Sequence, residues 1–494
     1  MDKTLENAFS AQTFTGYWQF QSKDYPDDYW GELSYDPRKD IHQLTLYGIC
    51  IFPCSGASAS QSPVITGVIT SGKIVSVFGS VIVNAKTGPG EKLNQKTIFS
   101  FLSYCVGEQR FWSKDSILLR KYSFRCSNLE VWAGYHLIGH RYSPRAKRTI
   151  GTVSLPKILP LYENDVVRIK LGTESNQKSS SYSLEVFCHH FILIEVKGNR
   201  KLPYYGETNS ISYYENIIKA FFCFVIGKHV QSFHHVGTTK KQRMEIPPDV
   251  AKTIPKRIQY DFEHVEFFSA YSSFDDNTTR EIQAHELLVH HSQINGEKLV
   301  CSIKQFFEHY HQFGFVLYDW IKMKNSTSYT NYSLPELLYN FDGLHQSLYP
   351  ECNTRSGYQS TINAIHSISP FDNYAELINS HNHKLPLRQR LQDILLIKLD
   401  PIFQFLTISQ RQTVIDNLVK VRNDAAHRKN AFFLRLQNIV PYIFLCEELI
   451  AIMILQCIGF HIDEIISILQ ERWNWLGLKN MLLEEFEADN DVHE

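Results

Sequence analysis

The sequence predicts an α+β protein of more than one domain, with a β-rich, sandwich- or barrel-like N-terminal half followed by an all-α helical bundle. Three observations predict this layout. The chain has 494 residues, which is enough for two or more separately packed cores. Short alternating apolar runs, punctuated by turn residues, fill the first part of the chain. After Leu299, apolar residues instead recur at helical spacing.

This change of pattern sets the domain bounds that we expect. They are a β-rich domain over residues 1–300, a connecting helix over 301–330, a helical domain over 331–480 and an acidic tail over 481–494. A polar stretch with Gly and Pro, residues 349–385, predicts a long connection inside the helical domain.

In the N-terminal half, Gly31–Asp36 and Gln43–Tyr47 alternate with a period of two and flank turn residues, so they predict a hairpin. A polar loop is expected at residues 173–181, and helical pieces at 214–224 and 284–291. Further strands are predicted within residues 64–85, 166–172 and 183–198. The C-terminal part predicts helices at 302–322, 335–348, 387–405, 409–427, 434–459 and 462–476.

Composition narrows the functional classes. Hydrophobic residues make up 43% and charged residues 20% of the chain, as in ordinary globular proteins. The formal net charge of −1 gives no global argument for binding nucleic acid, so any such surface must be a local patch. The 10 cysteines are scattered, several of them inside apolar runs, which indicates buried thiols in a reducing compartment.

No membrane association is expected from the sequence. Residues 1–20 lack a charged segment followed by an apolar one, so we predict no signal peptide. The most apolar segment, Ile439 to Phe460, is interrupted by Glu447 and Glu448 and is interpreted as a buried core helix. The protein is therefore expected in the cytoplasm.

Residues 421–428, Val-Arg-Asn-Asp-Ala-Ala-His-Arg, carry the strongest functional pattern. They end an amphipathic run, so we expect one face to be buried and the polar residues to be exposed. Asn423 and His427 are four residues apart and share a helix face. Arg422 lies about 140° round the helix from His427, since each residue turns the helix by about 100°. It must reach round the helix or meet the His of a second copy.

This order of Arg422, Asn423 and His427 resembles the R-N-x-x-x-H signature of the HEPN superfamily, small helical domains of which many are metal-independent ribonucleases. An independent resemblance lies near the N-terminus. Phe14-Thr-Gly-Tyr-Trp18, Gly31-Glu-Leu33, Pro37, Leu44-Thr-Leu46, Gly48, Phe124, Asn128–Trp132 and Trp320 resemble an ApeA-type N-terminal domain and the helix that follows it. Such domains precede an ApeA-like HEPN domain in bacterial anti-phage and abortive-infection proteins.

The resemblance implies an RNA endonuclease that stays inactive until phage infection, with transfer RNA as a target. His427 suits proton transfer because an imidazole titrates near neutral pH. Arg422 can grip two oxygens of the phosphate in the transition state, and Asn423 can orient the His427 ring. No cofactor or metal ion is needed, because the 2′-OH of RNA can attack the adjacent phosphorus. The products would carry a 2′,3′-cyclic phosphate and a 5′-OH.

One imidazole cannot serve easily as both acid and base. The HEPN resemblance implies that two motifs line one cleft, so we expect a homodimer or a larger even oligomer. A phage-derived trigger is a further expected partner. Asp342 stands where related domains carry an acidic residue that orients the Arg, although it also fits a solvated helix residue. Arg428 and Lys429, beside the motif, are placed to hold substrate phosphates.

Other patterns were weighed. Arg141, Arg145, Lys147 and Arg148 alternate with aromatic residues and could follow an RNA backbone, although such a run also fits a solvated loop. His285 and His290 miss the H-E-x-x-H spacing by one residue, so no zinc site is predicted there. Scattered cysteines and histidines, including Cys50, Cys54, Cys188–His190 and His381–His383, favour buried thiols and sheet histidines over a structural zinc.

Two rival functions stay open at this point. The helical bundle could be a non-catalytic module for dimerisation or RNA docking. It could also be the toxin half of a pair that a nucleotidyltransferase silences. The sequence does not choose the RNA target, the trigger or the number of subunits.

Overall fold

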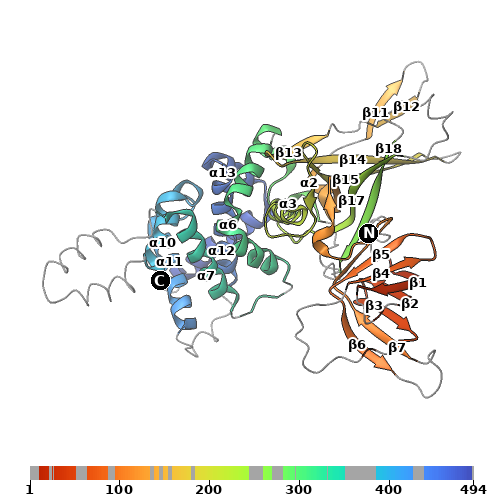
Figure 1. Ribbon diagram of the computed structural model, residues 1–494. Helices are drawn as coiled ribbons and strands as arrows, with labels where there is room; N and C mark the ends of the chain where they lie inside the picture. Colours follow the sequence, from red (N-terminus) through yellow and green to blue (C-terminus); the bar gives the residue numbers. More distant parts are fainter. Residues whose placement is uncertain are drawn as a thin grey trace, which may run out of the picture. The chain divides into compact units, whose positions relative to one another are not determined.

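The computed structural model describes residues 10–21, 25, 27–49, 51, 64–86, 95–133, 138–143, 148–153, 158–179, 184–243, 260–269, 282–294, 296–326, 328–330, 332–350, 385–426 and 439–491. The chain divides into two units. The β-rich unit comprises Met1–Phe222 and Val230–Ile282, and the helical unit comprises Cys223–His229 and Gln283–Glu494. An antiparallel sheet followed by helices confirms the predicted α+β class (Figure 1).

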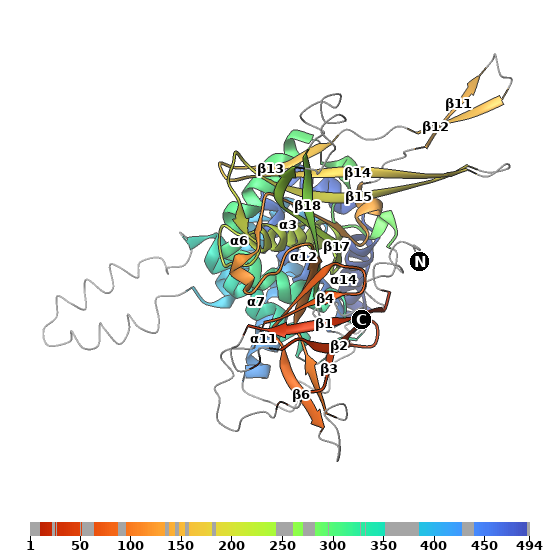
Figure 2. The ribbon, with the colours of Figure 1, turned by 45° about the vertical axis from the view of Figure 1, so that its right-hand side comes forward.

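The β-rich unit is built on one 14-stranded sheet with the order β13-β14-β15-β10-β17-β18-β8-β5-β4-β1-β2-β3-β7-β6. Its strands are β1 Gln12–Phe20, β2 Tyr29–Asp36, β3 Ile41–Tyr47, β4 Ile65–Ile69, β5 Ile74–Phe78, β6 Val81–Lys86, β7 Lys96–Ser100, β8 Ser103–Gly107, β10 Lys121–Cys126, β13 Leu159–Glu163, β14 Val167–Ser179, β15 Leu184–Val196, β17 Ser232–Arg243 and β18 Tyr260–Ser269. Two short pairs form sheets of their own. One is β9 Leu118–Leu119 with β16 Leu202–Pro203, and the other is β11 Ile138–Ser143 with β12 Arg148–Val153, which Figure 2 labels.

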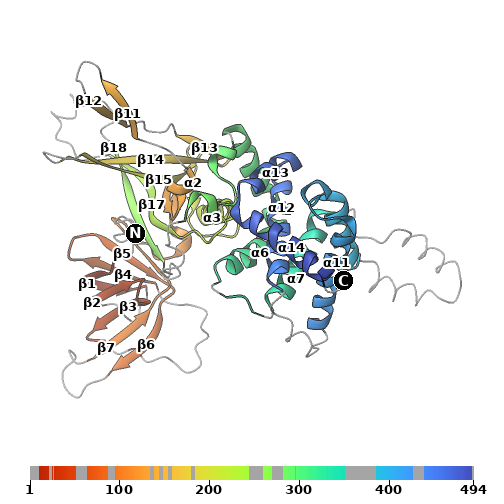
Figure 3. The same ribbon diagram turned by 180° about the vertical axis from the view of Figure 1, so that it is seen from behind.

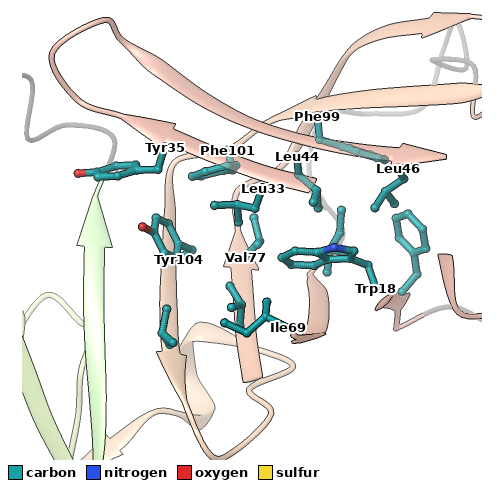
Figure 4. Close-up of a cluster of buried hydrophobic side chains, with 14 of the residues drawn as sticks. Trp18, Leu33, Tyr35, Leu44, Leu46, Ile69, Val77, Phe99, Phe101 and Tyr104 are labelled. Atoms are coloured by element: carbon teal, nitrogen blue, oxygen red, sulfur yellow. The ribbon is translucent and has the colours of Figure 1, made fainter. Parts of the chain in front are cut away.

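The first eight strands wrap round an apolar core. Their inward side chains come from every second position of the strands, as the alternating sequence pattern predicts. Trp18, Leu33 and Leu44 are fully buried at its centre, and Phe101 and Tyr104 meet edge to face at 5.6 Å (Figure 4). The many short strands expected in the N-terminal half are present, and they belong to one antiparallel sheet with β13 and β6 at its edges.

The Trp18 ring lies on glycines of two neighbouring strands. A Cβ atom at Gly31 would come within 2.9 Å of the ring, and one at Gly67 within 2.5 Å. Gly16 pairs with Gly31, and a Cβ atom there would stand 2.2 Å from the carbonyl oxygen of Val68. Only glycine allows the strands to approach so closely, which explains the Gly and Trp residues of the N-terminal motif.

The second half of the sheet packs against α3, Ile211–Ile226, close to the helix predicted at residues 214–224. Trp132 of α2, Leu129–Ala133, meets Phe222 edge to face at 5.1 Å. The buried Tyr122 hydroxyl lies 2.7 Å from Glu215 Oε2 of α3 and 2.6 Å from His235 Nδ1 of β17. Burial raises the pKa of Glu215, but His235 and Tyr122 outweigh it, so the pKa is lowered and the carboxylate stays ionised.

The outer face of this half carries a row of opposite charges. Glu163, Arg168, Glu195 and Lys121 stand opposite one another on β13, β14, β15 and β10. Arg168 Nε lies 2.9 Å from Glu163, and Lys121 Nζ lies 3.2 Å from Glu195. We call these four residues the outer charge ladder. Cross-strand pairs of this kind favour one register of the sheet.

Of three expectations for residues 1–300, two are wrong and one is confirmed. The hairpin of β2 and β3 is confirmed, with Asp36 paired to Ile41. The polar loop expected at 173–181 is wrong, because β14 continues to Ser179 and pairs with β15 throughout. Strand pairing uses backbone groups, so polar side chains do not end it. The helix expected at 284–291 is wrong too. Only 3-10 turns form at Ala284–Glu286 and His291–Gln293, because the intervening Val289 N–H donates to the Val225 carbonyl instead.

The helical unit is centred on α12, Val440–Cys457, which contacts α6, Gly296–Lys324, α7, Ser333–Leu348, α13, Ile462–Gln470, and α14, Trp473–Asp491 (Figure 3). The remaining α-helices are α10, Leu387–Gln392, and α11, Ile408–Ala426. By length and apolarity α12 would suffice to cross a membrane, but 72% of it is buried inside the protein. It is the core helix that the sequence predicts.

Two predicted helices are broken in the structure. Residues 387–405 form α10, then a π-helical turn at Asp393–Lys398 and a 3-10 turn at Asp400–Ile402, where Pro401 cannot continue a helix. The helix expected at 462–476 ends at Gln470, and Arg472 turns inward to pair with Glu448 before α14 begins. Helix α14 runs on to Asp491, through most of the residues expected in the acidic tail.

Candidate functional site

Helix α11 carries the first part of the predicted motif. Val414, Ile415 and Leu418 are buried, which matches the predicted apolar face. Near the start of the helix, the buried Arg411 donates to the Leu395 carbonyl at 3.0 Å and to Asp400 at 2.6 Å. This pairing attaches α11 to the broken segment that follows α10.

A polar chain fixes the second half of α11. The Asn417 amide donates to the Tyr442 hydroxyl of α12 at 2.7 Å. That hydroxyl donates in turn to Glu485 Oε1 of α14 at 2.8 Å. Tyr442 is buried, and Asn417 and Glu485 are half-buried. Three helices are thus held together about one turn before Arg422.

Arg422 and Asn423 lie on the exposed face of α11, as the helical pattern predicts. Arg422 Nη1 is 3.5 Å from Asn423 Oδ1, which is long for a hydrogen bond. Across the part of the chain that the structure describes, no ion pair involves Arg422. Arg422 is an exposed residue. His427, Arg428 and Lys429 lie outside the described residues.

Asp342 of α7 is paired with a different arginine. Arg390 of α10, whose side chain is almost fully buried, donates to the Asp342 backbone carbonyl at 2.9 Å and to Asp342 Oδ1 at 2.8 Å. Gln346 donates to the other carboxylate oxygen at 3.2 Å. This geometry joins α7 to α10, a structural role that neither reading of the sequence foresaw.

The basic run is split by the described ranges. Arg141 stands opposite Ile150 in the β11–β12 hairpin, and Arg148 stands opposite Ser143. Arg145 and Lys147 lie outside the described residues.

The remaining metal candidates differ in how far they can be placed. The His285 ring stacks on Trp473 at 4.7 Å, while His290 Nδ1 lies 2.7 Å from the Ser292 hydroxyl, so each ring has its own contact. Cys50, Cys54, His381 and His383 are outside the described residues. His189 and His190 lie buried on β15. Within the described ranges, no three His, Cys, Asp or Glu side chains gather as they would to hold a metal ion.

A second polar arrangement lies within the helical unit. Lys324 Nζ is 2.6 Å from Glu447 Oε2 and 3.8 Å from Glu448 Oε1. Arg472 grips Glu448 with two hydrogen bonds of 2.5 and 2.9 Å. The Glu447 side chain is 0% exposed and that of Glu448 3%. We call Lys324, Glu447, Glu448 and Arg472 the buried ion cluster.

The two carboxyl groups of this cluster behave differently. Burial raises the pKa of Glu447 above its ordinary value, and Lys324 only partly opposes this. Burial acts in the same direction on Glu448, but Arg472 and Lys324 outweigh it, so the pKa of Glu448 is lowered. Adjacent residues of one helix therefore hold protons with unequal strength.

Comparison with known proteins decides the family. The model of the ApeA N-terminal domain 1 matches residues 13–292, more than half of the 494-residue chain. The chain belongs to the ApeA N-terminal domain 1 family. Neither the curated proteins nor the solved structures give a match. The family supports an anti-phage defence protein.

The ApeA domain match extends over the first residues of the helical unit and ends before α6. Several of the motif residues that resemble an ApeA-type domain are core residues in the structure, although Tyr17 is 57% exposed. Trp18, Leu33 and Trp132 are fully buried, and Gly16 and Gly31 form the close strand contact. The resemblance to an ApeA-type domain therefore rests largely on residues that pack the sheet. Helix α11 with Arg422 follows the matched part of the chain.

Two groups of residues escaped sequence reasoning. Asn417, Tyr442 and Glu485 meet only because three helices pack together, and no spacing in the sequence signals that. The sequence did contain a signal for the buried ion cluster, because Glu447 and Glu448 interrupt an apolar segment. Adjacent carboxylates in such a segment require partners. What the sequence lacked was the identity of those partners, Lys324 and Arg472.

Proposed function

We propose that this protein is a metal-independent HEPN endoribonuclease that acts in the cytoplasm in anti-phage defence. Its ApeA-type N-terminal domain controls the activity, and transfer RNA is the target class. Arg422, Asn423 and His427 form the catalytic set. The observation that carries this proposal is the exposed position of Arg422, on the solvent face of a helix whose other face is buried.

The position of Arg422 favours catalysis over a structural role. Arg390 and Arg411 of the same unit are buried and paired with Asp342 and Asp400, as expected for arginines that hold helices together. Arg422 is exposed instead, and it is the arginine of the HEPN-like motif. An exposed guanidinium can grip two oxygens of one phosphate.

The reaction needs only groups that the chain and the RNA supply. The 2′-oxygen forms a bond to the adjacent phosphorus, and the bond from phosphorus to the 5′-oxygen breaks. A base takes the proton of the 2′-OH, and an acid gives a proton to the 5′-oxygen. His427 performs one of these transfers, and such transfer contributes about 10²- to 10⁴-fold to a rate. Arg422 stabilises the charge on the crowded phosphate.

Two copies of the motif complete the site. Each chain offers one imidazole in the motif, whereas cleavage uses an acid and a base. A homodimer, or a larger even oligomer, brings two histidines and two arginines to one cleft. The fixed position of α11, held by Asn417, Tyr442 and Glu485, gives each chain a rigid support for its half.

The test compares four full-length proteins expressed in phage-challenged bacteria: the wild type, Arg422→Ala, His427→Ala and Lys420→Ala. Lys420 is an exposed cation of the same helix and serves as the matched control. RNA 3′ ends are sequenced with capture of cyclic phosphates. The wild type and Lys420→Ala are expected to protect the cells and to leave 2′,3′-cyclic ends. The other two should lose both effects while remaining folded.

Full protection by Arg422→Ala and His427→Ala would contradict the nuclease and favour a scaffold for dimerisation or RNA docking. Loss of protection without loss of the cyclic ends would separate defence from cleavage. Dependence of toxicity on a neighbouring nucleotidyltransferase would favour the toxin pair.

A further inference from the structure

A hollow of about 330 Å³ opens within the helical unit, above the buried ion cluster. Its wall comes from six segments: the turn after α3, the segment before α6, the end of α6, Tyr329, Phe444 of α12, and the start of α14 with Arg472 before it. Ligand pockets have volumes of about 300–1,000 Å³, so the hollow suits a small molecule. Among the described residues of the proposed catalytic set, Arg422 and Asn423 do not line it.

The charges that line the hollow favour an anion. Lys228, Lys324 and Arg472 face it, against the single carboxylate of Glu286 among the lining residues, while Glu447 and Glu448 pair with Lys324 and Arg472 from outside the lining. Lys228 Nζ is 3.6 Å from Glu286, too long for a hydrogen bond, so its donors can turn to a ligand. Glu447 and Glu448 lie behind Lys324 and Arg472 and hold them in place.

The buried ion cluster contributes little net stability to the helical unit for the charges that it buries. Groups of similar volume without charge would stabilise a helix bundle as well or better, because each buried charge loses its water. Charges retained in such a place are therefore candidates for function. Here they fix two cations, Lys324 and Arg472, at one end of an open hollow.

The rim of the hollow offers a flat surface. Trp473 lines it and is 69% exposed, so its indole is accessible to a ligand. The His285 ring, 4.7 Å away at 25°, supports one of its faces. Gly477 stands one helical turn further along α14, and a Cβ atom there would meet nothing within 4 Å. A planar ring can therefore lie beside Trp473 over bare helix backbone.

We propose that the hollow binds a mononucleotide. Its base stacks on Trp473 over Gly477, and its phosphate is held by Lys228, Lys324 and Arg472. Arg422 and Asn423 are not part of this site, and nucleotide binding there can be measured without RNA cleavage. Base stacking tolerates any of the four bases, since every base has a flat face.

Titration calorimetry of the full-length protein tests the proposal. AMP, GMP, CMP and UMP are the probes, with adenosine and inorganic phosphate as partial ligands. At least one nucleotide should bind saturably, and more tightly than adenosine or phosphate. Trp473→Ala should weaken it by about tenfold, the usual scale for one stacking contact. Gly477→Leu should abolish binding by filling the space for the base. Lys228→Gln should weaken the binding of the nucleotide, which has a phosphate, but not the binding of adenosine, which has none.

Leu476→Ala is the matched control, because Leu476 is an exposed apolar residue of α14 outside the hollow. It should bind as the wild type does. Trp473 and Gly477 are exposed, so their replacement should leave the fold intact, which circular dichroism checks. Unchanged binding in Trp473→Ala and Gly477→Leu would overturn the proposal. So would the absence of binding by all four nucleotides, or binding of phosphate alone as tightly as AMP.

Discussion

The outer charge ladder of the β-rich unit and the buried ion cluster of the helical unit contain the same ingredients, two glutamates and two cations each. The environment makes them different. Glu163 and Arg168 are each nearly half exposed, and water competes for their charges. Glu447 and Glu448 are buried at 0% and 3% exposure, so neither can turn to water if its partner is lost. Ion pairs with similar N–O distances therefore differ in how far their removal lowers the free energy of unfolding.

Breaking the buried ion cluster should have the largest effect. Arg472→Ala leaves the Glu448 charge with Lys324 alone at 3.8 Å. We expect the free energy of unfolding of the helical unit to fall by about 3–5 kcal/mol, the usual cost of an uncompensated buried charge. Urea denaturation followed by circular dichroism measures it. Arg168→Ala in the outer charge ladder is the control and should change little. If the free energy of unfolding fell by similar amounts in Arg472→Ala and Arg168→Ala, burial would not distinguish the two groups of ion pairs.

The polar chain beside α11 should rank second. Tyr442→Phe removes the hydroxyl that joins Asn417 to Glu485. The expected loss in the free energy of unfolding is about 1–3 kcal/mol, because buried polar groups lose a partner. Tyr339, a 75% exposed residue of α7, gives the control Tyr339→Phe. An unchanged melting temperature in Tyr442→Phe would show that water replaces the hydroxyl.

The two glutamates of the buried ion cluster should respond to pH with opposite signs. The folded pKa of Glu448 lies below the ordinary 4.5, so its charge contributes stability above that pH and loses it as the pH falls through the folded pKa. The folded pKa of Glu447 lies above 4.5, so its charge is a cost that appears as the pH rises through the folded pKa.

The comparison uses Glu447→Gln and Glu448→Gln, with unfolding measured from acid to neutral pH. Relative to the wild type, Glu448→Gln should become less stable as the pH rises. Glu447→Gln should become more stable over the same range, because a glutamine cannot take up the unfavourable charge. Slopes of the same sign would mean that the two carboxyl groups share one proton.

The outer charge ladder should give the smallest effect. Arg168 and Lys197 lower the pKa of Glu163 to about 2, through hydrogen bonds at the surface. Its contribution would be lost only as the pH falls from 4.5 toward 2, and screening by solvent and salt reduces it further. Glu163→Gln should leave the melting temperature unchanged within error, in low salt as in high salt. A clear fall at low salt would show that this row acts as a unit.

Much of the fold followed from local pattern. Alternation gave the β2–β3 hairpin, and helical spacing gave α3, α6, α7, α11 and α12 close to their observed bounds. The order of strands did not follow. Strand β10 lies between β15 and β17, which come much later in the chain, and such pairing depends on packing between distant segments. The interruption at Asp400 coincides with Pro401, and the one at Glu471 precedes Arg472, whose partner Glu448 is distant in the sequence.

For the candidate site, the sequence predicted the exposed side of α11 correctly, since Arg422 and Asn423 are exposed and Leu418 is buried. It did not predict that Asp342 pairs with Arg390, because an arginine 48 residues away leaves no local trace. The sequence also did not predict the hollow beside Trp473, because its lining residues are far apart in the chain. Six segments of the chain meet there, and no one of them has a recognisable pattern.

The seat of Trp18 on Gly31 and Gly67 has a consequence for how relatives should be interpreted. A larger side chain at either glycine would displace the indole from the core, so folding alone constrains Trp18, Gly31 and Gly67. A match at these residues in another chain therefore indicates the same packing of the sheet. It carries no information on what activates that chain or on the reaction that it catalyses.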